Sequence, residues 1–130
     1  MFDLPLKIKA TEKTPLLEYN PKDRTFSVIG VSVPEDTKMF YDPILLWVSG
    51  YVKSNREGGL TININLDYFS TKTSLILLRI LKQFEVVPNV SVNWYYDDSE
   101  GREIGDDFST MVHLNFNLID KNLDIPKEYL

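Results

Sequence analysis

Three segments of the chain alternate between apolar and polar residues. Residues 60–66, 90–96 and 112–118 each place an apolar side chain at every second position. Between these lie Thr61, Asn63, Asn65, Ser91, Asn93, Tyr95, His113, Asn115 and Asn117. Because successive side chains of a strand point to opposite faces, the pattern predicts a sheet with one buried and one polar face. A sheet buried on both faces would show continuous apolar runs, so we expect helices mainly on one face and no Rossmann layout.

Shorter strand patterns occupy the beginning of the chain. Residues 6–9, 16–19 and 25–33 carry strand-forming residues, and the turn-forming residues 21–24 join the last two segments. This arrangement predicts an antiparallel, hairpin-like opening. Together with the later strands and the helical segments between them, it predicts an α/β domain with a mixed sheet.

A helical pattern follows the opening strands. Ile44, Trp47, Val48 and Tyr51 recur at a spacing of three and four residues, which places them on one helix face. Since proline fits the first turn of a helix and not its interior, Pro43 predicts a separate turn over residues 36–41. The main helix is then expected from a cap at residue 42 to about residue 54. Both tryptophans, the second at position 94, lie on apolar faces and are expected in the core.

At residues 66–74 an alternating strand gives way to a run of hydroxyl residues, and a strongly apolar helix is predicted over residues 73–84. A hydroxyl at a helix N-terminus is well placed for phosphorylation, since the free N–H groups and the helix dipole favour an anion there. The alternative is that Ser70, Thr71 and Thr73 only cap the helix. From the residues alone, this structural interpretation is favoured.

Composition and charge exclude several classes of function. The chain has 130 residues, 43% of them hydrophobic, which suits one core and a single domain over residues 1–130 with a loose tail at 121–130. Its net charge of −5, with scattered basic residues, indicates no nucleic-acid binding. No segment resembles a signal peptide or a membrane span, so we expect no membrane insertion and a cytoplasmic protein. The absence of cysteine excludes thiolate chemistry.

Six acidic residues near the end of the chain are the best candidates for metal ligands or catalytic carboxylates. Their spacing does not fit a calcium loop, so a solvated loop followed by an acidic helical turn is favoured. The single histidine, His113, has no cysteine or serine-elbow motif to complete a nucleophilic system. We therefore expect no enzyme, no metal and no cofactor. The acidic residues are Asp97, Asp98, Glu100, Glu103, Asp106 and Asp107.

Short motifs along nearly the whole chain resemble, in order, the SiaC family of bacterial regulatory phosphoproteins. They are Thr14-Pro15, Gly30-Val31-Ser32-Val33-Pro34-Glu35-Asp36, Phe40-Tyr41-Asp42-Pro43 before Trp47, Leu66-Asp67-Tyr68-Phe69-Ser70-Thr71, Val92-Asn93-Trp94-Tyr95-Tyr96-Asp97 and Glu103-Ile104-Gly105. The resemblance implies a fold similar to STAS domains. It also implies a protein that a partner kinase phosphorylates on a threonine and a partner phosphatase dephosphorylates. In the best-known system of that family, the unphosphorylated form binds and stimulates a diguanylate cyclase.

Carried over to this sequence, the resemblance makes Thr71 the phosphoacceptor. The family's asparagine before the acceptor is Ser70 here, and its two following serines are Lys72 and Thr73. Ser70, Thr73 and Ser74 are rival acceptors. Tyr68, Ser70, Lys72, Thr73 and Ser74 are expected to surround the phosphosite, and Pro34, Glu35 and Asp36 are expected to lie near it and to contribute to partner binding.

Three function classes follow. The first is a partner-switching regulator of a diguanylate cyclase or another signalling enzyme, with Thr71 as acceptor for a Ser/Thr kinase and phosphatase. The second is an interaction module that is never phosphorylated, in which Ser70 and Lys72 mark the loss of the switch. The third is a small enzyme that uses the acidic loop, for which no base, nucleophile or cofactor motif is present. The polar sheet face is either an ordinary solvent face or a docking surface.

Overall fold

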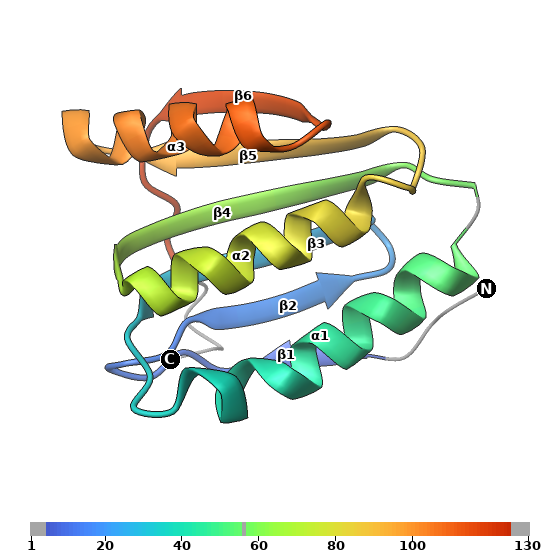
Figure 1. Cartoon of the computed structure of the whole chain (residues 1–130), viewed down its shortest axis with the longest axis horizontal. Helices are drawn as coiled ribbons and strands as arrows, with labels where there is room; N and C mark the ends of the chain where they lie inside the picture. Colours follow the sequence, from blue (N-terminus) through green and yellow to red (C-terminus); the bar gives the residue numbers. More distant parts are fainter. Residues whose placement is uncertain (1–4, 56, 126–130) are drawn as a thin grey trace.

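The chain folds into one six-stranded sheet with three helices, in a computed structural model that describes residues 5–55 and 57–125. The strands lie in sequence order across the sheet (Figure 1). The first three pair antiparallel and the last four pair parallel, so the sheet is mixed as predicted. The elements are β1 (Leu6–Ile8), β2 (Leu16–Asn20), β3 (Thr25–Ser32), α1 (Thr37–Ser54), β4 (Leu60–Phe69), α2 (Thr71–Phe84), β5 (Val90–Tyr96), α3 (Ser99–Met111) and β6 (Asn115–Asp120).

All three helices cover the same face of the sheet, which confirms the one-sided arrangement (Figure 1). Their apolar sides and the inward side chains of the strands form one continuous core. Trp47 and Trp94 are buried within it, as expected. Burial of this apolar surface is the main force that holds the helices on the sheet. In the described residues no helix is long and apolar enough to cross a membrane.

The opposite sheet face is polar, as the alternation predicts. Asn63, Asn93 and Asn117 occupy one row across β4, β5 and β6. Asn117 Nδ2 donates to Asn93 Oδ1 and Asn93 Nδ2 donates to Asn63 Oδ1, each over 3.1 Å. Each hydrogen bond between such half-buried or exposed amides contributes about 1 kcal/mol or less, so this row aligns the strands more than it stabilises the fold.

The segment after β6 crosses the polar face of the sheet and contacts β2, β3 and β4 on that face. The backbone N–H of Leu123 donates to Asn65 Oδ1, and Leu123 and Ile125 pack against Leu16 and Ile29. Residues 121–125 of the predicted tail thus contact the sheet through this small apolar cluster. Residues 126–130 of the predicted tail lie outside the described residues.

Helix α1 differs from the prediction at its start. It begins at Thr37, not after Asp42, and Pro43 lies inside it. Asp36 is the N-cap, and its side chain accepts a hydrogen bond from the backbone N–H of Met39 over 3.0 Å. Proline removes only the hydrogen bond to the carbonyl four residues earlier, that of Met39. Since Met39 is exposed, water can solvate this carbonyl, and the helix continues.

Three further boundaries differ from the prediction. Helix α2 begins at Thr71, two residues earlier than expected, because Ser70 caps it. The acidic region is not a loop with a single helical turn but the 13-residue helix α3. Because α3 extends to Met111, the last strand begins at Asn115 and not at residue 112. The helix buries one side of an otherwise polar segment against Trp94, a tertiary contact that overrides the polar composition.

Candidate functional site

The candidate site is built on the connection from β4 to α2. Ser70 has extended backbone geometry, and its hydroxyl oxygen accepts a hydrogen bond from the backbone N–H of Thr73 over 3.1 Å. The backbone N–H of Ser70 donates to the carbonyl of Ser32, at the end of the neighbouring strand β3, over 3.1 Å. The first turn of α2 is therefore capped locally and tied to the sheet.

Thr73 is held in a buried network of hydroxyl groups. Its Oγ1 donates to the carbonyl oxygen of Ser32 over 3.0 Å and lies 2.9 Å from Ser32 Oγ. Ser32 Oγ in turn lies 2.7 Å from the hydroxyl of Tyr41 in α1. Burial raises the pKa of Tyr41, and its hydrogen bonds to Ser32 and Thr73 oppose that shift. Thr73 thus joins β3, α1 and α2, and its side chain is inaccessible to another protein.

Thr71 lies two residues earlier and has the opposite environment. It is the first residue of α2 and is exposed, whereas Ser70 and Ser74 are half-buried. Its hydroxyl has no hydrogen-bond partner among the residues that the structure describes. Ser74 Oγ donates to the backbone carbonyl of Thr71 over 2.8 Å. Of the hydroxyl groups in this connection, that of Thr71 is the one open to solvent at a helix N-terminus, where the dipole favours an anion.

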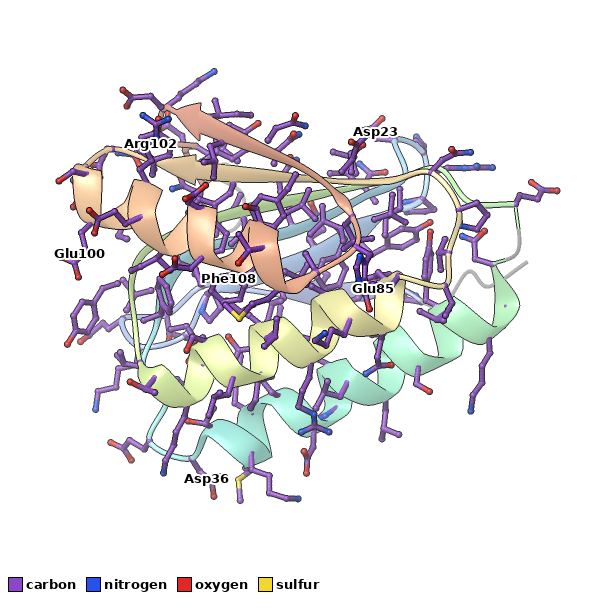
Figure 2. The ribbon with its side chains drawn as sticks, turned by 45° about the horizontal axis from the view of Figure 1, so that its top comes forward. Asp23, Asp36, Glu85, Glu100, Arg102 and Phe108 are labelled. Carbon is purple, nitrogen blue, oxygen red and sulfur yellow. The ribbon has the colours of Figure 1, made fainter. Side chains whose placement is uncertain are left out.

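A cleft of about 580 Å³ opens beside Thr71, between α2 and α3, and we call it the α2–α3 cleft. Its floor is apolar, with Phe69, Trp94 and Phe108 in contact through ring centroids 5.1 to 6.2 Å apart. Figure 2 shows Phe108 on the side of α3 that faces α2. Tyr68 and Met111 also line the cleft and remain 65% and 43% exposed. Aromatic and thioether groups are therefore available to a binding partner at this place.

The remaining wall of the α2–α3 cleft is acidic. Five carboxylates line it, and no lysine, arginine or histidine does; the five are Asp67, Asp97, Asp98, Glu100 and Asp107. Desolvation and the neighbouring Asp97 raise the pKa of Asp67. Within the described part of the chain, no group of three or more histidine, cysteine or acidic residues is arranged to hold a metal ion. The cleft has the electrostatic character of a site for cationic groups.

The loop between β3 and α1 lies on the other side of the start of α2. Glu35 and Asp36 share a second groove with Lys72, Leu75 and Arg79 of α2. The structure thus brings the loop that was predicted to lie near the acceptor to the helix that carries Thr71. Glu35 forms an exposed ion pair with Lys13 over 3.0 Å, and Asp36 caps α1, so both acidic residues also have structural roles. Pro34 precedes them in the same loop and is half-buried.

Comparison with protein families identifies the chain. A model of the SiaC family of regulatory phosphoproteins matches residues 8–121. The chain belongs to the SiaC family. A comparison with curated protein sequences finds no match.

Solved structures of SiaC from Pseudomonas aeruginosa have the same fold. The crystal structure of apo-SiaC is 21% identical to this chain, with a TM-score of 0.78 over 90% of this chain and 99% of that one. SiaC in the crystal structure of the diguanylate cyclase SiaD with its activator SiaC is 22% identical, with a TM-score of 0.79 over 88% of this chain and 98% of that one. At this level of identity the likeness establishes the fold.

The structure brings together some, but not all, of the residues around the SiaC family motif. Tyr68, Ser70, Thr71 and Ser74 all line the α2–α3 cleft. Lys72 lies on the other side of α2, and the side chain of Thr73 is buried between α2 and the sheet.

The sequence analysis missed the contribution of α3 to this site. Phe108 and Met111 form one wall with the acidic residues of the same helix. The spacing of Ile104, Phe108 and Met111 by four and three residues is the signal that could have indicated an amphipathic helix here.

Proposed function

We propose that this SiaC-family protein is a partner-switching regulator that binds and modulates a signalling enzyme such as a diguanylate cyclase. Phosphorylation of Thr71 by a Ser/Thr kinase and its reversal by a phosphatase control this binding. Membership of a family of regulatory phosphoproteins supports the proposal, and so does the complex between SiaC and the diguanylate cyclase SiaD in Pseudomonas aeruginosa. The chain itself acts as a regulator and not as an enzyme, in the cytoplasm.

The observation that carries the proposal is the contrast between Thr71 and Thr73. A kinase must reach the hydroxyl that it modifies, and Thr71 is exposed at the rim of the α2–α3 cleft. Thr73 is fully buried and donates its proton to a backbone carbonyl. Modification of Thr73 would require α2 to leave the sheet, whereas modification of Thr71 requires no rearrangement of the fold.

Phosphorylation of Thr71 acts at the surface of the protein. A phosphoryl group adds a charge of about −1.5 to −2 and three acceptor oxygens at the start of α2. Its interaction with the helix dipole contributes roughly 0.3 to 1 kcal/mol, which is too little to refold a domain. A partner that buries Thr71 against an apolar or acidic surface would instead have to desolvate a dianion. Phosphorylation therefore releases a partner that covers Thr71 itself with apolar side chains, even where that partner presents charged groups to another part of the cleft.

The test is intact-mass and fragment-ion mass spectrometry of the protein purified from its native host under several growth conditions. We expect phosphate on Thr71 and its loss in Thr71→Ala. The matched control is Ser74→Ala, a hydroxyl of the same cleft, which should keep the phosphate. Protein that is unmodified under every condition would instead identify a constitutive interaction module. Phosphate on Ser70 or Thr73 would refute the assignment of the acceptor.

A further inference from the structure

We propose that the α2–α3 cleft receives a segment of a protein partner that presents lysine or arginine side chains next to aliphatic ones. This inference rests on the proposed function, since it describes the partner of the site that carries Thr71. It specifies the chemistry of the partner: the cationic side chains face the acidic wall of the cleft, and the aliphatic ones cover Thr71.

The size and floor of the cleft suit a docked peptide segment. Its volume of about 580 Å³ is open on one side, between two helices that both begin at the carboxyl ends of the parallel strands (Figure 1). Trp94 and Phe108 are nearly fully buried at the floor, so the apolar surface that aliphatic side chains can meet comes from the half-buried Phe69 and from the rim. Tyr68 and Met111 project at the rim with much of their surface exposed. Exposed aromatic and methionine side chains are typical of protein-binding surfaces.

The negative charge of the cleft favours an occupant with positively charged groups. Its five carboxylates are not neutralised by any basic residue of the lining, although the whole chain carries 14 basic against 19 acidic residues. The ion pairs Lys13–Glu35, Arg24–Glu57 and Lys38–Asp42 all lie outside the lining of the cleft. An occupant with cationic groups would complement this potential, which steers association and sets specificity.

The same charges disfavour other occupants. A nucleotide, a phospholipid headgroup or nucleic acid would bring phosphate groups against five carboxylates. A purely apolar segment would leave Asp67 and Asp97 beside it without a counter-charge, where desolvation and repulsion by the Asp97 carboxylate already raise the pKa of Asp67. A cationic side chain between them relieves this repulsion.

The occupant is a partner and not the described tail of the same chain. After Asn122, which touches the rim of the cleft, the chain turns to the polar face of the sheet. Leu123 and Ile125 then pack against Leu16 and Ile29, on the side of the sheet opposite to the helices.

Binding of synthetic helices to the unphosphorylated protein tests the inference. The probe is a peptide with leucine and lysine at helical spacing, and its twin carries glutamate in place of every lysine. Titration calorimetry or fluorescence anisotropy should detect the lysine peptide and not its twin. Binding should weaken with added salt, since the contacts are largely electrostatic.

Two variants with the same change in net charge locate the binding. The triple variant Asp67→Asn, Glu100→Gln and Asp107→Asn neutralises the cleft and should weaken binding by about tenfold or more. The control is Glu12→Gln, Glu103→Gln and Asp106→Asn, all exposed and outside the cleft lining, with two of them on the same helix α3. It should weaken binding by no more than about twofold.

The outcomes separate this inference from the proposed function. Equal weakening in both triple variants would mean attraction to the overall negative charge and would overturn the inference, as would absence of binding to the unchanged protein. Neither outcome depends on the phosphate, because the protein is tested unphosphorylated. Conversely, an unphosphorylated Thr71 in the native host would refute the switch and leave the peptide binding unaffected. Circular dichroism melts of each variant control for folding.

Discussion

The buried hydroxyl of Thr73 should contribute more to stability than the exposed hydroxyl of Thr71, although the two residues share the first turn of α2. The substitution Thr73→Val tests this, because valine keeps the β-branched shape and removes only the hydroxyl. It deletes the hydrogen bond to the Ser32 carbonyl and the contacts with the hydroxyls of Ser32 and Ser70.

The loss in the free energy of unfolding depends on which hydrogen bonds remain to the groups that Thr73 contacts. The Ser32 carbonyl still accepts from the backbone N–H of Ser70, and the Ser32 hydroxyl still pairs with Tyr41. Ser70 Oγ still accepts from the backbone N–H of residue 73. Because no partner is left wholly unpaired, the cost lies within the ordinary net range for an intramolecular hydrogen bond, about 0.5 to 1.5 kcal/mol.

This loss can be expressed as a melting temperature. An unfolding entropy of about 2.1 cal/mol/K per residue gives about 0.27 kcal/mol/K for the 130-residue chain. A loss of about 1 kcal/mol therefore lowers Tm by about 4 °C. The matched variant Thr71→Val, at an exposed position, should change the free energy of unfolding by no more than about 0.5 kcal/mol.

Urea unfolding followed by circular dichroism measures both variants under the same conditions. Equal midpoints for Thr73→Val and Thr71→Val would refute the reasoning, since the network would then add nothing to stability. A double-mutant cycle with Ser32→Ala refines the test. We expect the double variant to lose less stability than the sum of the two single losses, because both substitutions remove the contact between Thr73 Oγ1 and Ser32 Oγ.

Two further predictions concern the α2–α3 cleft. Burial and the Asp97 carboxylate raise the pKa of Asp67 above its ordinary value of 3.8, so its ionised form opposes folding at neutral pH. Asp67→Asn should therefore raise Tm at neutral pH, and this gain should vanish as the pH falls below 3.8; a gain that is independent of pH contradicts the assignment. At Gly105 an added Cβ would lie 2.5 Å from Trp94 Cδ1, so Gly105→Ala should destabilise the fold by about 1 to 3 kcal/mol in urea unfolding, and an unchanged midpoint would disprove the close packing of α3.

The alternating strands could be predicted from the sequence because burial of one sheet face produces the alternation of apolar and polar residues. In β4 and β5 every second side chain enters the core, so the period of two is preserved from sequence to structure. Helix α3 carries a shorter signal, the spacing of Ile104, Phe108 and Met111. It buries Gly105 and Phe108, and a buried glycine adds nothing to an apolar pattern although it permits the close contact with Trp94. Similarly, Pro43 favoured a helix start near residue 42, whereas the helix begins after its N-cap Asp36, seven residues before the proline.

The position of the candidate site could be predicted from the sequence, but the role of each hydroxyl residue in it could not. Four hydroxyl residues follow one another closely in residues 70–74, and their local sequence does not distinguish an anchor from an acceptor. Thr73 is distinguished by Ser32, which lies 41 positions earlier and meets it only because β3 and β4 pair in parallel. The acidic wall needed the same kind of information, since Asp67 and Asp97 become neighbours only through the order of the strands.

The division of roles at the start of α2 limits how a phosphate on Thr71 can act. Thr73, two residues further on, ties this turn to β3 and through Ser32 to Tyr41 of α1. Breaking these contacts would cost about 1 to 3 kcal/mol, more than the roughly 0.3 to 1 kcal/mol by which a charge interacts with the helix dipole. The anchored turn therefore stays folded in either state. What changes is the surface of the α2–α3 cleft, so the partner has to sense the phosphate by direct contact there.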